Sequence, residues 1–322
     1  MAINRASISK QLLPGLNAIF GLEYGSIDDE QRVLFEQESS ERAFEEEVLM
    51  TAFGEAPVKA EGAAVEYDTA AESWTARYTH ETVALAFAVT EEAMEDNLYD
   101  TFAKIRAKGL ARAMASTKQV KAANVFNNGF STSYPIGDDA AFFSDSHPTI
   151  SGTNQDNLLT AADLSEASLE TAVIAIQKTK DDRDILIGAM PMSLHIPPDL
   201  QFTAEKILGS NMSTAPIYAS NAAGNAVGTS TDSKGVSNSN DINAVRSMGV
   251  MPKGSFVNHR FTDTNGWFVK TDVPNGTKYF VRAALATKME PDFDTGNLRF
   301  KARERYSFGV SDWRGYYGNQ GA

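Results

Sequence analysis

The chain reads Leu298-Arg-Phe-Lys-Ala-Arg-Glu-Arg-Tyr306 within the longer C-terminal stretch Phe293–Gly318. Two sets of side chains alternate along it: Leu298, Phe300, Ala302 and Glu304 in one set, and Arg299, Lys301, Arg303 and Arg305 in the other. A period of two is typical of a β-strand, because successive side chains point to opposite faces. We therefore predict a long strand with a mostly apolar face and a basic face. An aromatic and glycine-rich end follows, and we expect the C-terminus to be built into the fold.

Length and composition indicate a folded protein. The 322 residues, 42% hydrophobic and 22% charged, suffice for a sizeable core and predict two packed regions. No apolar run approaches the roughly 18 residues of a membrane span, and Met1–Lys10 lacks the apolar core of a signal peptide. Because the chain has no cysteine, disulfides, thiolate metal sites and a cysteine nucleophile are excluded. We expect the protein to be made and assembled in a cytoplasm.

Charge is distributed unevenly along the chain. The net charge is −13; residues 23–47 hold ten acidic and two basic residues, whereas residues 104–121 hold six basic and no acidic ones. A net acidic surface is a poor generic binder of phosphates, which argues against nucleic-acid recognition as the main activity. Many soluble proteins are acidic, so charge alone does not define the function.

The N-terminal segment, Met1 to about Met50, is predicted to be an arm. Its apolar residues are sparse, and the one helical candidate, residues 26–48, has only a thin apolar stripe. Such a segment buries too little surface to be ordered alone, so it is either disordered or lies on another subunit. The alternative is an N-terminal helix packed on its own domain.

An extended hairpin and a very long helix are predicted next. In residues 51–89, Trp74, Ala76 and Tyr78 alternate with polar residues, and the phase slips near His80 before a second apolar run. A phase slip in a strand indicates a bulge or a sharp twist, and the outer half of the hairpin is predicted to project from the body. From Thr90, a helix N-cap, apolar residues recur at helical spacing through residues 91–126.

The C-terminal half is predicted to be mixed. We expect helices from Thr160 to about Lys180 and after Pro197-Pro198, a buried strand at Asp184–Met190, and a long flexible loop over residues 210–240. Residues 250–261 and 267–269 are predicted to be strands joined by a hairpin turn at Asn265-Gly266. Strands over 278–289 and 298–310 complete the chain, which predicts an α+β fold.

No motif indicates catalysis or a cofactor. Asp145-Ser146-His147 could suggest a nucleophile, but a triad requires convergence in space rather than adjacency, so a loop with a turn at His147-Pro148 is the better interpretation. His80, His195 and His259 have no second ligand at metal spacing. The chain has no glycine-rich phosphate loop, and we predict neither enzymatic activity nor a bound cofactor or metal.

An ordered set of motifs over residues 90–318 resembles the Mu-like branch of tailed-phage major capsid proteins, which have the Hong Kong 97-like fold. The motifs are Phe143-Ser-Asp-Ser-His-Pro148, Leu158–Leu169, Lys180-Asp-Asp-Arg183, Pro197–Glu205, Asn240-Asp-Ile-Asn243, Trp267–Asp272 and Phe293-Asp-Thr-Gly296. Residues 1–89 match the family in the order of their predicted elements more than in amino-acid sequence. The resemblance implies the major capsid protein of a tailed double-stranded DNA bacteriophage, which self-assembles as hexamers and pentamers into an icosahedral shell.

The resemblance also implies a division into capsid domains. Residues 1–50 would be the N-terminal arm and 51–89 the extended loop laid over the next subunit. Residues 90–160 and 264–322 would form the peripheral domain, with its spine helix at about 91–126, and 161–263 the axial domain. Because the arm starts almost at Met1, a separate scaffolding protein is implied, together with a portal protein, a possible decoration protein and packaged DNA bound without sequence specificity.

Contacts between copies are predicted to carry the function. Acidic residues of the arm would meet basic strips on neighbours, and hairpin aromatics would anchor the contact. The residues are Glu36, Glu45 and Glu46, opposite Arg106 and Arg112 or Arg303 and Arg305, with Trp74 and Tyr78 as anchors. Some family members join neighbours by Lys-to-Asn isopeptide bonds; Lys59 is the only lysine of the hairpin, but nothing marks an asparagine partner.

Two other functions remain open from the sequence. An encapsulin-like nanocompartment would have the same fold around cargo enzymes instead of DNA. A soluble enzyme of unrecognised type would be a small oligomer. The contents and size of the purified particle distinguish the three.

Overall fold

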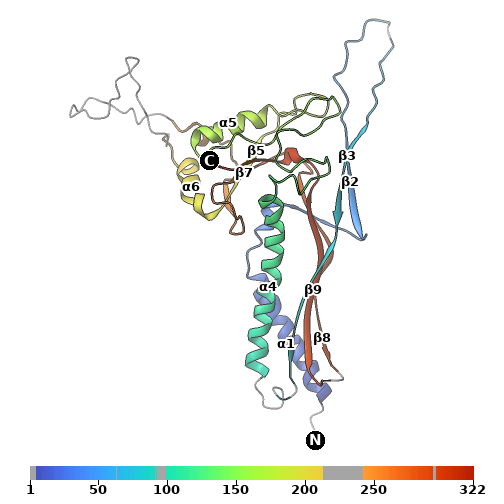
Figure 1. Ribbon diagram of the computed structural model, residues 1–322, viewed down its shortest axis with the longest axis vertical. Coiled ribbons are helices and arrows are strands. Elements are labelled where there is room, and N and C mark those ends of the chain that lie inside the picture. The colour runs from blue at the N-terminus through green and yellow to red at the C-terminus, as the bar shows by residue number, and fades with distance from the viewer. Residues whose placement is uncertain (1–4, 63, 91, 93–98, 213–241, 293–294) are drawn as a thin grey trace, which may run out of the picture. The chain divides into compact units, whose positions relative to one another are not determined.

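The computed structural model describes residues 5–62, 64–90, 92, 99–212, 242–292 and 295–322 (Figure 1). The chain divides into two compact units. Unit 1 comprises the segment ending at Glu47, Ala76–Phe126 and Thr277–Val310; unit 2 comprises Val48–Thr75, Asn127–Gly276 and Ser311–Ala322. Both helices and strands are present, so the predicted α+β class is confirmed.

Unit 1 is built on a four-stranded sheet in the order β1-β8-β9-β4. Its strands are β1 (Glu36–Ser39), β8 (Thr277–Pro291), β9 (Leu298–Val310) and β4 (Glu81–Val89). Strand β9 pairs antiparallel with β8 and with β4, and β1 pairs parallel with β8. Along β9, Leu298, Phe300 and Ala302 are buried whereas Arg299, Lys301 and Arg303 are exposed. The predicted alternation of an apolar and a basic face is therefore confirmed.

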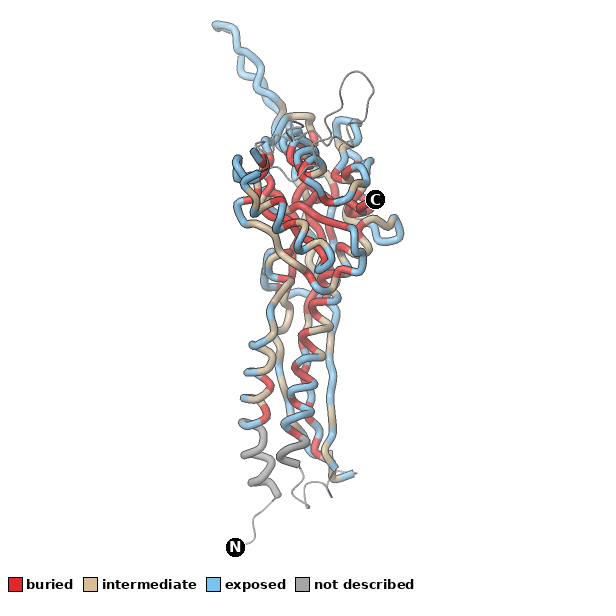
Figure 2. Tube along the Cα trace, turned by 90° about the vertical axis from the view of Figure 1, so that its left-hand side faces the viewer, coloured by how far each residue is buried: buried red, intermediate tan, exposed pale blue. Residues whose placement is uncertain are grey.

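Two helices cover the apolar face of this sheet. Helix α4 (Tyr99–Asn127) confirms most of the predicted long helix; residues 91 and 93–98 lie outside the described part. Leu16 and Phe20 of α1 (Arg5–Gly25) pack with the buried face of α4 and with Phe300 of β9. Figure 2 shows this one-sided burial as buried positions on the two helices. The α4 positions in the cluster are Ala103, Ala107, Leu110, Ala111 and Met114.

The predicted helix over residues 26–48 is wrong. That stretch contains the single-turn α2 (Gln31–Leu34), strand β1 and strand β2 (Phe44–Met50). The helix of this region is α1, and its buried Leu16 and Phe20 pack within their own chain, as in the alternative interpretation of the arm. Leu16 and Phe20 of α1 are buried because Phe300, from the opposite end of the sequence, supplies the other side of the contact.

Strand β2 pairs with β3 (Glu72–Thr79), and residues 51–71 connect them. Strand β3 ends at Thr79 and β4 begins at Glu81, so the predicted phase slip at His80 is confirmed. His80 is buried and fixes the break, because its two ring nitrogens contact the Ser40 hydroxyl at 2.8 Å and the Ser307 hydroxyl at 2.9 Å.

Unit 2 contains the second sheet, in the order β10-β7-β5-β6. Its strands are β5 (Pro191–Ile196), β6 (Ser255–Val257), β7 (Trp267–Thr271) and β10 (Tyr316–Asn319). Strand β5 lies between β6 and β7, so the predicted hairpin at Asn265-Gly266 is wrong. A turn does form there, since the Asp263 carboxylate accepts from the Asn265 backbone N–H at 2.9 Å, but the strands it joins are not neighbours.

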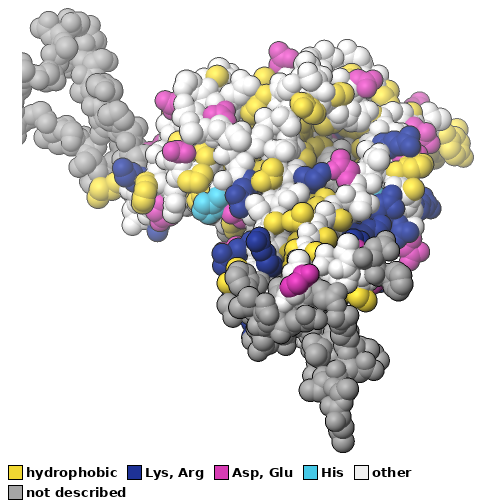
Figure 3. Space-filling view, turned by 60° about the horizontal axis from the view of Figure 1, so that its bottom comes forward, with side chains coloured by type: hydrophobic (Ala, Val, Ile, Leu, Met, Phe, Trp, Pro, Cys, Tyr) yellow, Lys and Arg dark blue, Asp and Glu magenta, His cyan; other side chains and the backbone are white. Residues whose placement is uncertain are grey.

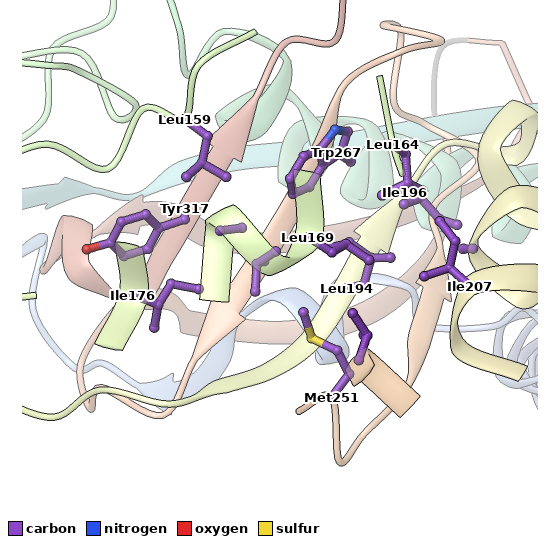
Figure 4. Packing of buried hydrophobic residues seen from close by; sticks show 14 of the residues in the cluster. Leu159, Leu164, Leu169, Ile176, Leu194, Ile196, Ile207, Met251, Trp267 and Tyr317 are labelled. Carbon is purple, nitrogen blue, oxygen red and sulfur yellow. The ribbon is translucent and has the colours of Figure 1, made fainter. Parts of the chain in front are cut away.

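Helices α5 (Glu166–Gln177) and α6 (Gln201–Gly209) enclose the core of unit 2 (Figure 4). Ser165 and Ser168 form a capping box at the start of α5, later than the predicted Thr160, and the 3₁₀ turn η1 (Pro198–Leu200) leads into α6 as predicted. The short α7 (Ala244–Ser247) and η2 (Trp313–Gly315) complete the unit. Residues 184–190 do not form the predicted strand: Leu186 is 63% exposed, and β5 begins only at Pro191. The predicted loop over 210–240 lies almost entirely outside the described residues.

Candidate assembly surfaces

The face of the unit 1 sheet opposite α1 and α4 carries a row of basic side chains, here called the basic row: Arg299, Lys301, Arg303 and Arg305 of β9. Alanines flank the row on both neighbouring strands, because Ala84 and Ala286 pair with Arg303, and Ala86 pairs with Lys301. Of the four, Arg299 pairs with Asp292 at 2.6 Å. Small flanking residues leave the long basic side chains open to an approaching partner. Figure 3 shows Lys and Arg side chains in small groups with apolar side chains between them on the face that it presents.

The acidic residues predicted to meet neighbours are largely paired within their own chain. Glu45 accepts a hydrogen bond from Ser40 at 2.7 Å, and Glu46 lies 3.7 Å from Arg77. Glu36 is exposed on β1. Of the predicted helix cations, Arg112 pairs with Glu23 at 2.6 Å. Arg106 is exposed and lines a groove beside β4. Sequence reasoning assigned these charges to neighbours because the alternation of β2 and the position of α1 were not predicted.

Trp74 and Tyr78 do not fit the predicted role of anchors on a neighbour. Trp74 is 8% and Tyr78 2% exposed in the single chain. The Trp74 indole donates to the Ser311 carbonyl at 3.1 Å, and the Tyr78 ring packs edge-on against Phe280 at 4.8 Å. Both aromatics therefore stabilise their own chain, and little of either surface is left for another copy.

The connection over residues 51–71, here called the hairpin loop, presents apolar side chains to solvent. Thr51 and Ala71 close its base, and the Asp68 carboxylate accepts from the Gly54 N–H at 2.7 Å and from Arg183. The Gly54 and Thr69 backbone N–H groups, followed by Arg183, lower the pKa of Asp68. Beyond this base, Val58 is 100% and Tyr67 96% exposed.

A buried ion pair crosses unit 1. Lys118 of α4 lies 2.6 Å from Glu304 of β9, and the two side chains are 10% and 3% exposed. Lys118 also donates to the Tyr24 hydroxyl. Burial alone would lower the pKa of Lys118, but Tyr279 and the Glu304 carboxylate raise it overall, so the lysine stays charged. The sequence contained one signal for this ion pair, because Glu304 is a charged residue on the otherwise apolar face of β9. Its partner, Lys118, was not predicted.

A second buried network in unit 2 explains the Asp145-Ser146-His147 motif. The His147 ring bonds to Asp138 at 2.6 Å and to Asn157 at 3.0 Å, and it stacks on Trp313 at 4.4 Å. Ser146 instead contacts Ser144. His147 is completely buried, so the motif has a structural role, as the sequence indicated.

Arg314 adds an ionic element to the same region. It lies 3.4 Å from Asp312, pairs with Asp182, and its guanidinium is 4.5 Å from the Trp313 ring. Burial raises the pKa of Asp312, although Arg314 opposes the shift.

Within the described residues, no group of three metal-ligating side chains is found, and no helix is long and apolar enough to cross a membrane.

Comparison with known proteins identifies the family. A family model described as phage capsid protein matches residues 72–319, well over half of the chain, so the chain belongs to the phage capsid protein family. None of the curated proteins compared with it matches.

Solved structures with a similar fold are capsids and a virus-like particle. The capsid of a native GTA particle is 16% identical over 92% of this chain and 91% of that one, with a TM-score of 0.52. A virus-like particle from Pyrococcus furiosus is 11% identical over 95% and 98% (TM-score 0.52), and the bacteriophage JBD30 procapsid is 12% identical over 98% and 76% (TM-score 0.52). The fold is the Hong Kong 97-like capsid fold.

The chain is a major capsid protein of the phage head, and its function is structural rather than enzymatic. The family match favours this function over an encapsulin-like compartment. Its functional surfaces are consequently those through which copies of the chain assemble into a capsid.

Proposed function

We propose that copies of this chain assemble as hexamers and pentamers into a closed icosahedral shell around a double-stranded DNA genome. The observation that carries the proposal is the hairpin loop, which exposes Val58 and Tyr67 almost completely while its base is fixed by Asp68 and Arg183. A monomer gains nothing from a structured base under uncovered apolar side chains, whereas a neighbouring copy can bury them.

The capsid domains are proposed with bounds adapted to the compact units. Helices α1 and α4 with the sheet β1-β8-β9-β4 would form the peripheral domain, with α4 as its spine helix. Residues 127–276 and 311–322 of unit 2 would contain the axial domain. The hairpin loop would be the extended loop, and the segment up to residue 50 the N-terminal arm, of which α1 packs on its own chain.

Charge complementarity supports contacts between copies. The acids of the arm are largely paired internally, whereas Glu55, Glu61 and Glu66 of the hairpin loop are exposed, as are Lys301 and Arg303 of the basic row. Each exposed pair contributes only about 0–1 kcal/mol, so the effect depends on repetition around the shell. We therefore expect salt to slow assembly rather than abolish it.

The remaining partners follow from the same proposal. A portal protein, a separate scaffolding protein and a decoration protein would bind the shell, and packaged DNA would contact its inner wall without sequence specificity. The protein would be assembled in a bacterial cytoplasm and remain in the virion. The resemblance to the Mu-like branch stays a proposal as well.

The test is expression of the chain followed by size-exclusion chromatography and cryo-electron microscopy. Closed shells, and nuclease-protected DNA in phage particles, are the expected result. Protein cargo in place of DNA would favour the encapsulin-like compartment, and a small stable oligomer at all concentrations would refute both. Denaturing gel electrophoresis of purified particles tests whether Lys59 forms an isopeptide cross-link. A single band at 34.9 kDa excludes it.

A further inference from the structure

Strand β4 is an open edge of the unit 1 sheet. It pairs with β9 on one side, and no backbone hydrogen bond from the described residues reaches its other side. Its sequence after Thr82 is Val-Ala-Leu-Ala-Phe-Ala-Val89, with no charge and no proline. Edge strands of soluble proteins normally carry charges, prolines or bulges that prevent pairing with another chain. A long apolar edge without any of these is a site where a further strand adds.

A groove runs beside this edge, between β4 and α4. It has a volume of about 460 Å³ and is lined by Leu85 and Phe87 of β4 and by Ile105, Arg106, Gly109 and Leu110 of α4. Leu85 is 49% and Ile105 61% exposed, and no heavy atom lies within 4 Å of where a Cβ on Gly109 would be. The groove is therefore open and, apart from Arg106, apolar, and it can receive side chains of an added strand.

The same chain has an exposed segment of matching pattern. In Ala64–Tyr67 of the hairpin loop, Val65 and Tyr67 are 66% and 96% exposed, and Glu66 stands between them. In an extended strand, Val65 and Tyr67 would point to one face and Glu66 to the other. The aromatic and the β-branched side chain are of the types enriched in strands.

The two faces of an added strand would both find complementary surfaces. If Val65 and Tyr67 enter the groove beside α4, Glu66 lies on the face of the basic row. Adjacent strands are about 4.8 Å apart, so Glu66 would stand roughly 10 Å from the β9 backbone, with β4 between them. The β4 residues on that face are Ala84, Ala86 and Ala88, and their small side chains leave a path along which Lys301 or Arg303 can reach the carboxylate.

We propose that residues 64–67 of a second copy add to the outer edge of β4, with Val65 and Tyr67 in the groove and Glu66 facing the basic row. The inference rests on the proposed shell assembly and specifies one of its contacts. It belongs to the strand-addition mode, in which backbone hydrogen bonds supply affinity and alternate side chains supply specificity.

Disulfide trapping tests the contact, because the chain has no cysteine and every thiol would be an introduced one. Glu66→Cys is combined in turn with Ala84→Cys, Ala86→Cys and Ala88→Cys, which cover the possible registers. Paired strands bring Cα atoms within about 5.5 Å, inside the range of a disulfide. The matched control is Glu66→Cys with Ala284→Cys, an exposed alanine of β8, which is separated from β4 by β9.

The expected result is a ladder of disulfide-linked multimers from oxidised shells for at least one β4 pair and none for the control. Hydrogen exchange of the unsubstituted chain gives a second readout: amides of β4 should exchange at least about tenfold more slowly in shells than in the unassembled subunit. This measurement shows whether assembly covers the β4 edge even if a cysteine variant does not assemble, and unchanged exchange in shells would overturn the proposal.

Three further outcomes overturn the proposal while leaving shell assembly intact. Shells without a ladder from any β4 pair, or with an equal ladder from the control, exclude the named contact. Slow exchange in shells without a ladder assigns the edge to a different segment or partner. Exchange that is already slow in the unassembled subunit means that the chain covers its own edge. Failure of the unsubstituted chain to form shells would instead count against the proposed function.

Discussion

Replacing one partner of the buried Lys118–Glu304 pair should destabilise the subunit strongly. Lys118→Met leaves the Glu304 carboxylate buried without its cation, and Glu304→Leu leaves the Lys118 ammonium without its anion. Both side chains are at most 10% exposed, so water cannot replace the lost partner. One Glu304 oxygen already lacks a hydrogen-bond partner among the described residues, and besides Lys118 the carboxylate contacts only the neutral Tyr24 hydroxyl through a hydrogen bond, which cannot replace a cation.

The magnitude follows from the cost of a buried unpaired charge. Breaking a buried pair from one side costs about 3–5 kcal/mol, whereas replacing both partners with apolar residues is often neutral or stabilising. We expect about 3 kcal/mol for each single variant, because the Tyr24 hydroxyl remains near the lysine and Lys118 lies 5.2 Å from the Tyr24 ring. The double variant Lys118→Met with Glu304→Leu should lie within about 1 kcal/mol of the natural chain.

Urea unfolding of the unassembled subunit, followed by circular dichroism, measures all four forms of this double-mutant cycle. The expected coupling energy is several kcal/mol, since the double variant should be far more stable than the sum of the two single changes predicts. Arg112→Met with Glu23→Leu, an ion pair between α4 and α1 whose arginine side chain is 70% exposed, is the control and should show a coupling of less than about 1 kcal/mol. Additive losses at Lys118 and Glu304 would show that the pair is solvated, and the reasoning would fail.

Three further predictions concern pH, packing and assembly. Burial, with Lys270 and Lys253, lowers the pKa of His195 to about 3. The unfolded chain takes up this proton near the ordinary pKa of about 6.5. As the pH is lowered from about 6.5 to about 3, the free energy of unfolding should therefore decrease by about 1.4 kcal/mol per pH unit relative to the His195→Asn variant, measured by urea titrations at each pH. Gly315→Ala should cost about 3 kcal/mol in thermal or urea unfolding, because its Cβ would lie 2.5 Å from the Gly276 Cα and neither backbone can yield; an unchanged midpoint would contradict this. Lys301→Glu with Arg303→Glu should leave the fold intact by circular dichroism but reduce the yield of shells in light scattering at least about tenfold at low salt; a normal yield would exclude a role for the basic row.

Local patterns predicted the elements whose own residues determine them. The alternation from Leu298 to Tyr306 predicted β9 and its two faces, because each burial position is set by the pleat of one strand. The long apolar periodicity similarly predicted α4. The break at His80 was also predictable from the sequence, because the apolar residues change there from even to odd positions and a strand can bury both sets only if it is interrupted.

Elements that depend on distant partners were missed. Helix α1 has Pro14 within it, and its buried Leu16 and Phe20 gain their contact from Phe300 near the other end of the chain. The run Ile185-Leu-Ile187 was predicted to be a buried strand, but Gly188 adopts a φ of +70° and the strand starts beyond it. Pairing across a sheet is a non-local property, which is why the turn at Asn265-Gly266 did not identify the neighbours of β7.

The surfaces were predicted less well than the fold. Trp74 and Tyr78 were expected at an interface because large aromatics are common there, but the same residues are equally suited to a core. Burial distinguishes the two roles, and burial depends on which segments fold back onto the hairpin. By contrast, Arg303 and Arg305 were assigned to a basic face by pattern alone, and Arg303 is exposed there.

The uncovered edge of β4 has a consequence for the kinds of particle that can form. A contact between a loop of one copy and a strand edge of the next uses two different patches, so it propagates from head to tail. Such a chain of contacts closes into a ring only if the rotation between successive copies divides a full turn, and otherwise it grows into a helical tube. A small change in the direction of the hairpin loop at its base, which Asp68 and Arg183 fix, should therefore convert closed shells into tubes.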